Sequence, residues 1–185
     1  MIVLKDVSFQ YEGCEEGVHG IDLTVCDGEC VVLTGPSGGG KTTLTRLLNG
    51  LAPSYYQGTK KGDLWINYTE IASLPAWKIG QEIGSVFQDP KSQFFSSELA
   101  GEVAFACENY GMAKQEIRKR TDEAIASMGL ETLRARPLDV LSSGEKQRVA
   151  VASVYALRPH TYVCDEPTAN LDSEGATRLA GILRK

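Results

Sequence analysis

The chain has 185 residues, of which 42% are hydrophobic, so it is long enough to bury a core as one domain or a domain with a small lobe. Its net charge of −5 disfavours a nucleic-acid partner, and its five scattered cysteines indicate reduced thiols in a cytosolic protein rather than a disulfide framework or a zinc site. Charge at Lys5 and Asp6 comes too early for a signal peptide, and no apolar run approaches the ~20 residues of a membrane span.

Two half-exposed strands are predicted at the start of the chain. Their faces alternate as follows: Val3, Val7 and Phe9 against Leu4, Asp6 and Ser8, then Ile21, Leu23 and Val25 against Asp22 and Thr24. Tyr11 follows the first strand and would stack on an adenine ring, a contact worth about 1–3 kcal/mol. For Tyr11 alone, an aromatic that covers the core is the favoured interpretation.

A phosphate-binding loop is the strongest motif of the sequence. The pattern G-x-x-x-x-G-K-[ST] is matched by Gly35, Pro36, Ser37, Gly38, Gly39, Gly40, Lys41 and Thr42, with Thr43 next. The segments on either side of the loop also suit such a motif. Before the loop, the apolar run 30–33 predicts a buried strand. After it, Leu44, Leu47, Leu48 and Leu51 form one apolar stripe of a helix that Gly50 and Pro53 help to end.

Strand, loop and helix in this order point backbone N–H groups and a helix N-terminus at an anion. Glycines let the chain curl around a β-phosphate, Lys41 would reach the β- and γ-phosphates, and the Thr42 hydroxyl would ligate Mg²⁺. The alternative, a glycine-rich turn without a ligand, is disfavoured because strand, helix, lysine and threonine are all in place.

The middle of the chain reads as two strands and two packing helices. Leu64, Ile66 and Tyr68 alternate, and a further strand over 83–87 runs into Gln88. Ligands bind at the carboxyl ends of strands in open α/β sheets, so Gln88 is a candidate Mg²⁺ or water contact, although a weak one in isolation. Apolar residues at helical spacing predict helices over 98–110 and around 117–128, ended by Gly111 and Gly129.

A third helix begins at residues 141–148, and its body, 149–157, is apolar almost all round and therefore predicted to be buried. Ser142 with Glu145 three residues on forms a capping box, which is a sufficient structural reason for both residues. The functional alternative is that this helix N-terminus binds a phosphate. The residues alone leave the two interpretations open.

The apolar run 161–164 predicts a strand that ends in two adjacent carboxylates, Asp165 and Glu166. Such a pair is costly at the end of a buried strand unless metal or water occupies the site. Beside a phosphate loop, Asp165 would hold Mg²⁺ and Glu166 would polarise the attacking water. A solvated turn between strand and loop is the alternative.

Taken together, these motifs resemble the ATP-binding subunit of an ATP-binding cassette (ABC) transporter over essentially the whole chain. The matching features, in order, are the adenine-stacking aromatic Tyr11, the Walker A loop 35–43, the Q-loop residue Gln88, the signature 141–147, the Walker B segment 162–166 and the D-loop 169–172, ending in Asp172. The segment 88–95 with 102–109 looks most like the energy-coupling-factor (ECF) branch, which imports vitamins and cobalt or nickel ions.

The resemblance implies a mechanism that one chain cannot complete. Two such domains face each other head to tail, so ATP held by one Walker A loop is covered by signature residues Ser142, Ser143, Gly144 and Glu145 of the other. The capping box and the phosphate contact then use the same helix end. ATP closes the dimer, and hydrolysis at Glu166, with Asp165 and Gln88 on Mg²⁺ and Lys41 on the phosphates, reopens it and moves a membrane subunit.

The fold class implied by the resemblance is α/β: a P-loop NTPase (RecA-like) core with an antiparallel β subdomain and a helical subdomain, lacking the C-terminal strands. The expected divisions are a core over 1–90, a helical subdomain over about 91–157 and a Walker B and D-loop segment over 158–185. The expected location is the cytoplasmic face of the cell membrane, as a peripheral subunit. Its partners would be a second ATPase domain and integral membrane subunits, with no nucleic acid.

The sequence departs from the family at two places. Ser143 and Glu145 replace a glycine and a glutamine of the usual signature Leu-Ser-Gly-Gly-Gln, a variant that we expect to be tolerated. The family's switch histidine has no counterpart, because His19 and His160 both precede the Walker B carboxylates and are expected at the surface. We therefore expect the chain to be a fragment of a longer product, with weak or absent ATPase activity by itself and a gap in its sheet between 31–33 and 162–164.

Two other functions fit parts of the pattern. One is a nucleotide-binding regulatory module that does not hydrolyse, which the missing histidine favours and the intact Lys41, Asp165 and Glu166 disfavour. The other is an ABC-type ATPase outside transport, acting on chromosomes or DNA repair. That class needs a long coiled-coil insertion between Q-loop and signature, for which this chain has no room.

Overall fold

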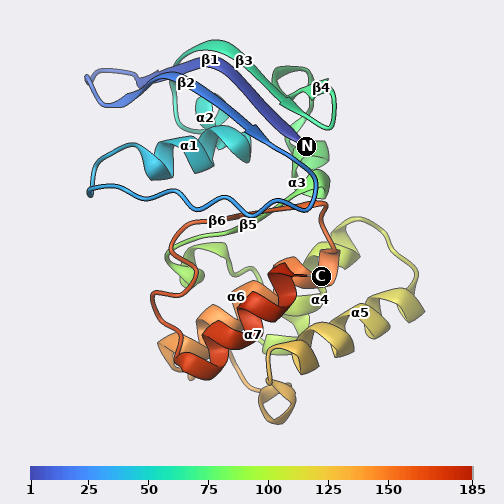
Figure 1. The fold of residues 1–185 in the computed structure, drawn as a ribbon. Coiled ribbons are helices and arrows are strands. Elements are labelled where there is room, and N and C mark those ends of the chain that lie inside the picture. The colour runs from blue at the N-terminus through green and yellow to red at the C-terminus, as the bar shows by residue number, and fades with distance from the viewer. Residues whose placement is uncertain (185) are drawn as a thin grey trace. The chain divides into compact units, whose positions relative to one another are not determined.

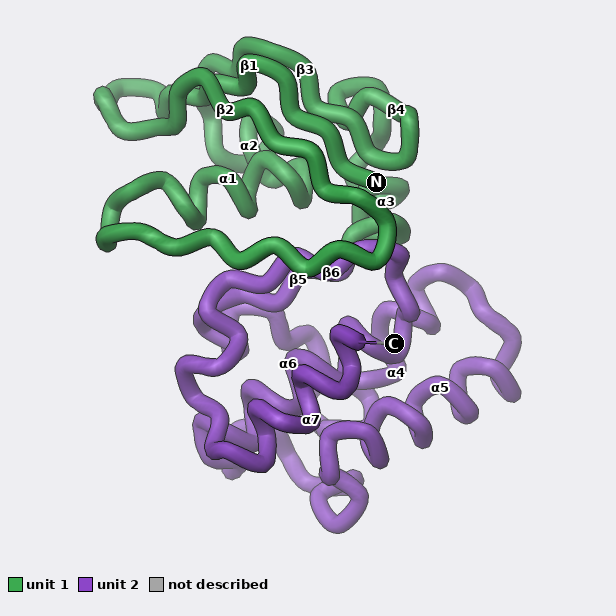
Figure 2. The backbone as a smooth tube through the Cα atoms, viewed as in Figure 1, with its two compact units in different colours: residues 1–83 green, residues 84–185 purple. Residues whose placement is uncertain are grey.

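A computed structural model describes residues 1–184 and divides the chain into two compact units, residues 1–83 and residues 84–185 (Figure 2). Figure 1 gives the element labels used below. Each unit is described by itself. The division into segments at residues 90 and 157 expected from the sequence stays a prediction.

The first unit is built on a four-stranded antiparallel sheet with the strand order β2-β1-β3-β4 (Figure 1). Its strands are β1 (Ile2–Tyr11), β2 (Gly17–Val25), β3 (Gly58–Ile66) and β4 (Thr69–Glu70). The two early strands and the later strand that holds Leu64 and Ile66 are therefore confirmed. Tyr68 was expected to continue that strand, but it lies in the turn after it with φ of 66° and is 85% exposed.

A bulge in β1 changes which of its side chains are buried, so the buried face differs from the predicted one. The pairing register shifts between Leu4 and Val7, where Asp6 adopts φ of 47°. The shift places both Leu4 and Val7 in the core, although a regular strand would put them on opposite faces, and leaves Val3 only half-buried. Simple alternation could not predict this because a bulge changes the side-chain period within one strand.

Short helices complete the first unit: α1 (Lys41–Leu48), α2 (Leu51–Ser54), α3 (Ala76–Glu82) and the 3₁₀ turn η1 (Ile71–Ser73). Three residues of the predicted apolar stripe, Leu44, Leu47 and Leu48, are buried on α1. The fourth, Leu51, was wrongly placed on the same helix, because α1 ends before Gly50 and Leu51 begins α2, half-buried. Gly50 adopts φ of 74° and separates α1 from α2, as expected of a glycine that ends a helix.

The buried strand predicted over residues 30–33 is absent, and that prediction was wrong. Residues 29–36 form no strand, and Val31, Val32 and Leu33 are 38%, 77% and 41% exposed. A strand needs a neighbour to satisfy its backbone N–H and C=O groups, and none of the strands within residues 1–184 pairs with this run.

The second unit packs four helices with a pair of strands. Its elements are β5 (Ile83–Val86), η2 (Pro90–Gln93), α4 (Leu99–Asn109), α5 (Lys114–Ser127), η3 (Glu131–Leu133), α6 (Ser143–Leu157), β6 (Thr161–Cys164) and α7 (Ser173–Leu183). Strands β5 and β6 pair with each other. The strands β5 and β6 and the helices α4, α5 and α6 are where the sequence predicts them, whereas no element is predicted at η2, η3 or α7.

The core of the second unit is centred on α6, which is surrounded by α4, α5 and α7 (Figure 1). Val149, Ala150, Val151 and Ala152 are all buried, which confirms the prediction that this helix is apolar on nearly every side. Because α6 is packed on nearly every side, the backbone N–H groups of its first turn are held in a fixed position.

Both histidines, His19 and His160, lie at the surface, as the sequence predicts. No disulfide joins the cysteines of residues 1–184. None of the helices in the described part of the chain is long and apolar enough to cross a membrane.

Candidate functional site

The phosphate loop wraps around its own lysine. Lys41 Nζ donates hydrogen bonds to the carbonyl oxygens of Gly35 at 2.9 Å and Pro36 at 2.8 Å. The backbone N–H of Gly39 donates to the Pro36 oxygen at 3.1 Å, which closes the turn. The ammonium is thus kept at the mouth of an exposed loop, where phosphate oxygens would be stronger acceptors than these neutral carbonyls.

Gly40 is the residue that joins this loop to α1. Its φ of 83° and the position of a Cβ, which would lie 2.5 Å from Val18 Cγ1, together require glycine here. Gly40 is also the N-cap of α1 and supplies no side-chain cap. The N–H groups of the first turn are therefore open to an anion, and the helix dipole favours one.

Tyr11, the predicted adenine-stacking residue, is tied to the end of the phosphate loop. Its hydroxyl donates to Thr43 Oγ1 at 3.2 Å and accepts a hydrogen bond from Arg46 Nη1 at 2.9 Å. Sequence reasoning placed Tyr11 and Thr43 in the site but missed Arg46. The available signal was its spacing, because a residue three positions after Thr43 lies on the same side of a helix.

The predicted catalytic glutamate pairs with the predicted Q-loop glutamine in the second unit. Gln88 Nε2 donates to Glu166 Oε2 at 2.9 Å, although 78 positions separate the two residues. Gln88 follows β5 and Glu166 follows β6, and the Asp165 N–H donates to the Val86 oxygen at 2.9 Å, which aligns the two strand ends. Pairing of the strands therefore brings these side chains together.

The backbone at Glu166 is strained. This residue adopts φ of 47°, a left-handed conformation that costs a non-glycine residue on the order of 1 kcal/mol or more. Strain of this kind persists where the surrounding structure fixes one geometry, and it is concentrated at functional sites. Its side chain is exposed, so the carboxylate is accessible to water.

Both hydrogen bonds of the predicted capping box are present at the start of α6. Ser142 Oγ accepts from the Glu145 N–H at 3.3 Å, and Glu145 Oε2 accepts from the Ser142 N–H at 2.8 Å and from the Ser142 hydroxyl at 2.8 Å. The bond from the Ser142 backbone, and next the one from its hydroxyl, lower the pKa of Glu145 below its ordinary value of 4.5.

This capping box predicts a pH-dependent contribution to stability. Because folding lowers the pKa of Glu145, its contribution is present above pH 4.5 and is lost as the pH falls through the folded value. We expect Glu145→Gln to lower the free energy of unfolding at pH 7, by well under about 1 kcal/mol for such an exposed group. The difference from wild type should shrink at pH 3.5 in urea titrations.

Glu70→Gln, at an exposed glutamate of β4, is the matched control and should show no such pH-dependent difference. A Glu145→Gln deficit that grew toward low pH would contradict this role of the carboxylate.

The signature and D-loop segments meet in the second unit. A Cβ on Gly144 would lie 2.8 Å from the carbonyl oxygen of Asn170, so only glycine permits this approach. Two residues further on, Asp172 caps α7 by accepting a hydrogen bond from the Gly175 N–H at 2.8 Å. The close approach of Gly144 to Asn170 therefore places the first turn of α6 beside the loop that leads into α7.

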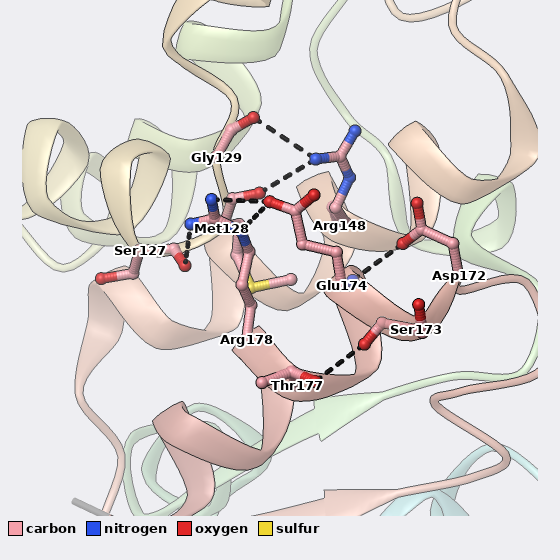
Figure 3. Close-up of polar contacts among 10 residues, drawn as sticks. Ser127, Met128, Gly129, Arg148, Asp172, Ser173, Glu174, Thr177 and Arg178 are labelled. Atoms are coloured by element: carbon pink, nitrogen blue, oxygen red, sulfur yellow. Dashed lines mark hydrogen bonds and ion pairs between the residues drawn. The ribbon is translucent and has the colours of Figure 1, made fainter.

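Two arginines anchor these same helices to the C-terminal end of α5 (Figure 3). From α6, Arg148 Nη1 donates to the Met128 and Gly129 oxygens at 3.2 and 3.3 Å. From α7, Arg178 Nη1 donates to the Ser127 oxygen at 3.5 Å, while its Nη2 pairs with Glu174 at 2.9 Å. Cations at a helix C-terminus stabilise its free carbonyls. Neither arginine was singled out in the sequence.

The predicted site residues are thus distributed over both units. The first holds Tyr11 and the loop 35–43. The second holds Gln88, Ser142, Ser143, Gly144, Glu145, Asp165, Glu166 and Asp172. Within the second unit the structure unites Gln88 with Glu166, and Gly144 with the D-loop.

The residues predicted to hold Mg²⁺ have suitable chemistry. Thr42, Gln88 and Asp165 offer hydroxyl, amide and carboxylate oxygens, which are the ligands that Mg²⁺ prefers. Because the Gln88 amide nitrogen is engaged by Glu166, its carbonyl oxygen remains for a cation. Residues 1–184 contain no group of three or more His, Cys, Asp or Glu side chains that could hold a metal ion by itself.

Comparison with known proteins gives consistent matches. The ABC transporter family matches residues 18–169. A putative ABC transporter ATP-binding protein of Treponema denticola is 38% identical over 186 aligned residues, which cover 100% of this chain and 38% of the relative. One from Caldanaerobacter subterraneus subsp. tengcongensis is 39% identical, with coverage of 100% and 33%. The chain therefore spans about a third of the length of these relatives.

Solved structures show the same fold. CbiO1 from Clostridium perfringens, part of the ABC transporter complex cbiONQ, aligns with a TM-score of 0.83 and 32% identity over 99% of this chain and 72% of its own. The ATP-binding cassette MJ0796, solved as a post-hydrolysis dimer bound to ADP and Pi, aligns with a TM-score of 0.85 and 28% identity, covering 99% of this chain and 81% of its own. The predicted α/β cassette fold is confirmed.

Proposed function

We propose that this chain, which belongs to the ABC transporter family of ATP-binding proteins, binds and hydrolyses ATP to power the movement of a solute across a membrane. The single observation that carries hydrolysis is the 2.9 Å hydrogen bond between Gln88 and Glu166. It holds a carboxylate beside an amide at the ends of two paired strands, the arrangement needed to orient and deprotonate a water molecule.

Each group has a role in this reaction. Lys41 and the N-terminus of α1 bind the β- and γ-phosphates, and Tyr11 stacks on the adenine. Glu166 accepts the proton of the attacking water, and Gln88 orients both. Thr42, Gln88 and Asp165 would hold Mg²⁺, which would supply positive charge to the phosphates. Asp165 and Glu166 are adjacent in sequence, so one would face the cation and the other the water.

The proposed partners are a second ATPase domain, which would complete the ATP site, and integral membrane subunits. Ser142 and Gly144 lie at the N-terminus of α6, where free N–H groups favour an anion, and they would cover ATP held by the loop of a second ATPase domain facing head to tail. Integral membrane subunits would dock near Gln88, which places the chain as a peripheral subunit at the cytoplasmic face. No nucleic acid is required.

An importer of the ECF type is the finer proposal. The segment 88–95, with its Gln-Asp-Pro and paired phenylalanines, supports it, as does the likeness to cbiO1. Purification of the chain with its membrane subunits from detergent extracts, followed by a phosphate-release assay, tests this proposal. We expect stoichiometric membrane subunits and Mg²⁺-dependent hydrolysis. A chain that binds ATP but is recovered alone and does not hydrolyse it would instead be a regulatory module.

A further inference from the structure

Arg46 sits at the centre of a cluster that includes the proposed adenine-stacking residue. Its guanidinium carbon lies 3.9 Å from the ring centroid of Tyr56 and 5.9 Å from that of Tyr11. At 3.9 Å a guanidinium is in stacking contact with an aromatic face. Arg46 Nη1 also donates to the Tyr11 hydroxyl at 2.9 Å, so one side chain engages both tyrosines.

The chemistry of these groups fixes the direction of the hydrogen bonds. Arginine has donors and no acceptor, so the Tyr11 oxygen must accept from Arg46, and the phenolic proton is directed to Thr43 Oγ1 at 3.2 Å. Thr43 Oγ1 then accepts from Tyr11, which leaves its own hydroxyl proton for another acceptor. A chain of donors therefore runs from Arg46 through Tyr11 to the last residue of the phosphate loop.

The ring of Tyr11 is oriented by its aromatic neighbours as well. It meets Phe9 edge to face, with centroids 4.9 Å apart, and Tyr56 in the same manner at 6.4 Å. Phe9 is fully buried, so this contact ties Tyr11 to the core of the first unit. Tyr11 also lines an open cavity of about 720 Å³, together with Glu12, Gly13 and Thr59, which leaves room for a ligand beside it.

We propose that Arg46 and Tyr56 are positioning residues for base recognition, which act by holding Tyr11 at a fixed place relative to the phosphate loop. This inference rests on the proposed function, in which Tyr11 stacks on the adenine. Arg46 belongs to α1, whose N-terminus would receive the phosphates, so the base platform and the phosphate site are fixed to one helix. The two ends of the nucleotide are then recognised at a set separation, which lowers the entropic cost of binding.

Binding of two different ligands distinguishes positioning of the base-stacking tyrosine from a general effect of Arg46 on the phosphate loop. ATP uses both the platform and the loop, whereas inorganic tripolyphosphate uses the loop alone. For the purified chain with Mg²⁺, we expect Arg46→Met to weaken ATP binding about 10-fold and tripolyphosphate binding less than about 2-fold, by isothermal titration calorimetry. Methionine keeps the unbranched apolar stem of the side chain and removes the donors and the charge.

Neighbouring residues supply matched controls. Tyr56→Leu should reproduce the selective loss of ATP affinity, whereas Tyr68→Leu, at a tyrosine that is 85% exposed, should not. Lys61→Met removes one exposed positive charge from β3 and should leave both affinities unchanged. Arg46→Lys keeps the charge but loses the planar stack, so it should restore only part of the ATP affinity.

Specific outcomes would overturn the assignment. Equal losses for ATP and tripolyphosphate would show that Arg46 acts on the phosphates or on loop stability, and unchanged ATP affinity in both Arg46→Met and Tyr56→Leu would show no role. If Arg46→Met does not melt cooperatively, Tyr56→Leu and Arg46→Lys carry the same comparison. A wild-type chain that binds neither ligand contradicts the proposed function itself, which distinguishes that failure from this one.

Discussion

Replacing Lys41 by alanine is expected to weaken ATP binding by at least about 100-fold, the largest effect of any single substitution on affinity. In the structure its ammonium donates to two loop carbonyls, those of Gly35 and Pro36. A triphosphate would replace these neutral acceptors by negatively charged oxygens, so the charged ammonium would gain ion-pair attraction in addition to its hydrogen bonds. Calorimetry with ATP and Mg²⁺ measures the loss.

Lys61→Ala is the control for this substitution. Lys61 is exposed on β3, and its replacement by alanine removes one positive charge from the same unit. Its ATP affinity should stay within about 2-fold of wild type, as surface charges contribute little through screened solvent. If Lys41→Ala bound ATP as well as Lys61→Ala does, the loop 35–43 would not be the phosphate site.

The second large effect is expected on turnover. Glu166→Gln should lower the rate of ATP hydrolysis by about 10²–10⁴-fold, the usual contribution of a general base, with ATP affinity retained. The amide keeps the size of the side chain and its acceptor for Gln88 but cannot take a proton from water. The measurement is steady-state phosphate release with the chain assembled with its partner subunits.

Glu174→Gln provides the comparison, since Glu174 is an exposed glutamate of α7 that pairs with Arg178. It should hydrolyse ATP at close to the wild-type rate. Wild-type turnover in Glu166→Gln would refute the assignment of the base and would favour a module that binds without hydrolysis.

Local signals in the sequence predicted much of this structure. The capping box at Ser142 and Glu145 depends on two residues three positions apart, and both of its hydrogen bonds form. The helix after the phosphate loop followed from its leucine spacing and was correct. Gln88 and Glu166 were each predicted from their position after a strand, and they pair in the structure because those two strands pair.

The failures have physical causes that local patterns do not contain. The run 30–33 has strand composition, but an apolar run becomes a strand only when a neighbour pairs with it, and none of the described strands does. The bulge at Asp6 depends on pairing with β2 and β3. Arg46 and Tyr56 are ten positions apart, and their contact depends on how α1 and the chain before β3 fold back.

In the proposed mechanism this chain supplies half of an ATP site, and the other half belongs to a second ATPase domain. Sedimentation velocity of the Glu166→Gln chain with fluorescent ATP and Mg²⁺ tests it most directly, because one run reports both bound nucleotide and particle mass. We expect a one-chain particle without ATP and a two-chain particle that carries the nucleotide when ATP is present. ATP that sediments only with a single chain, at saturating nucleotide and protein, would contradict it.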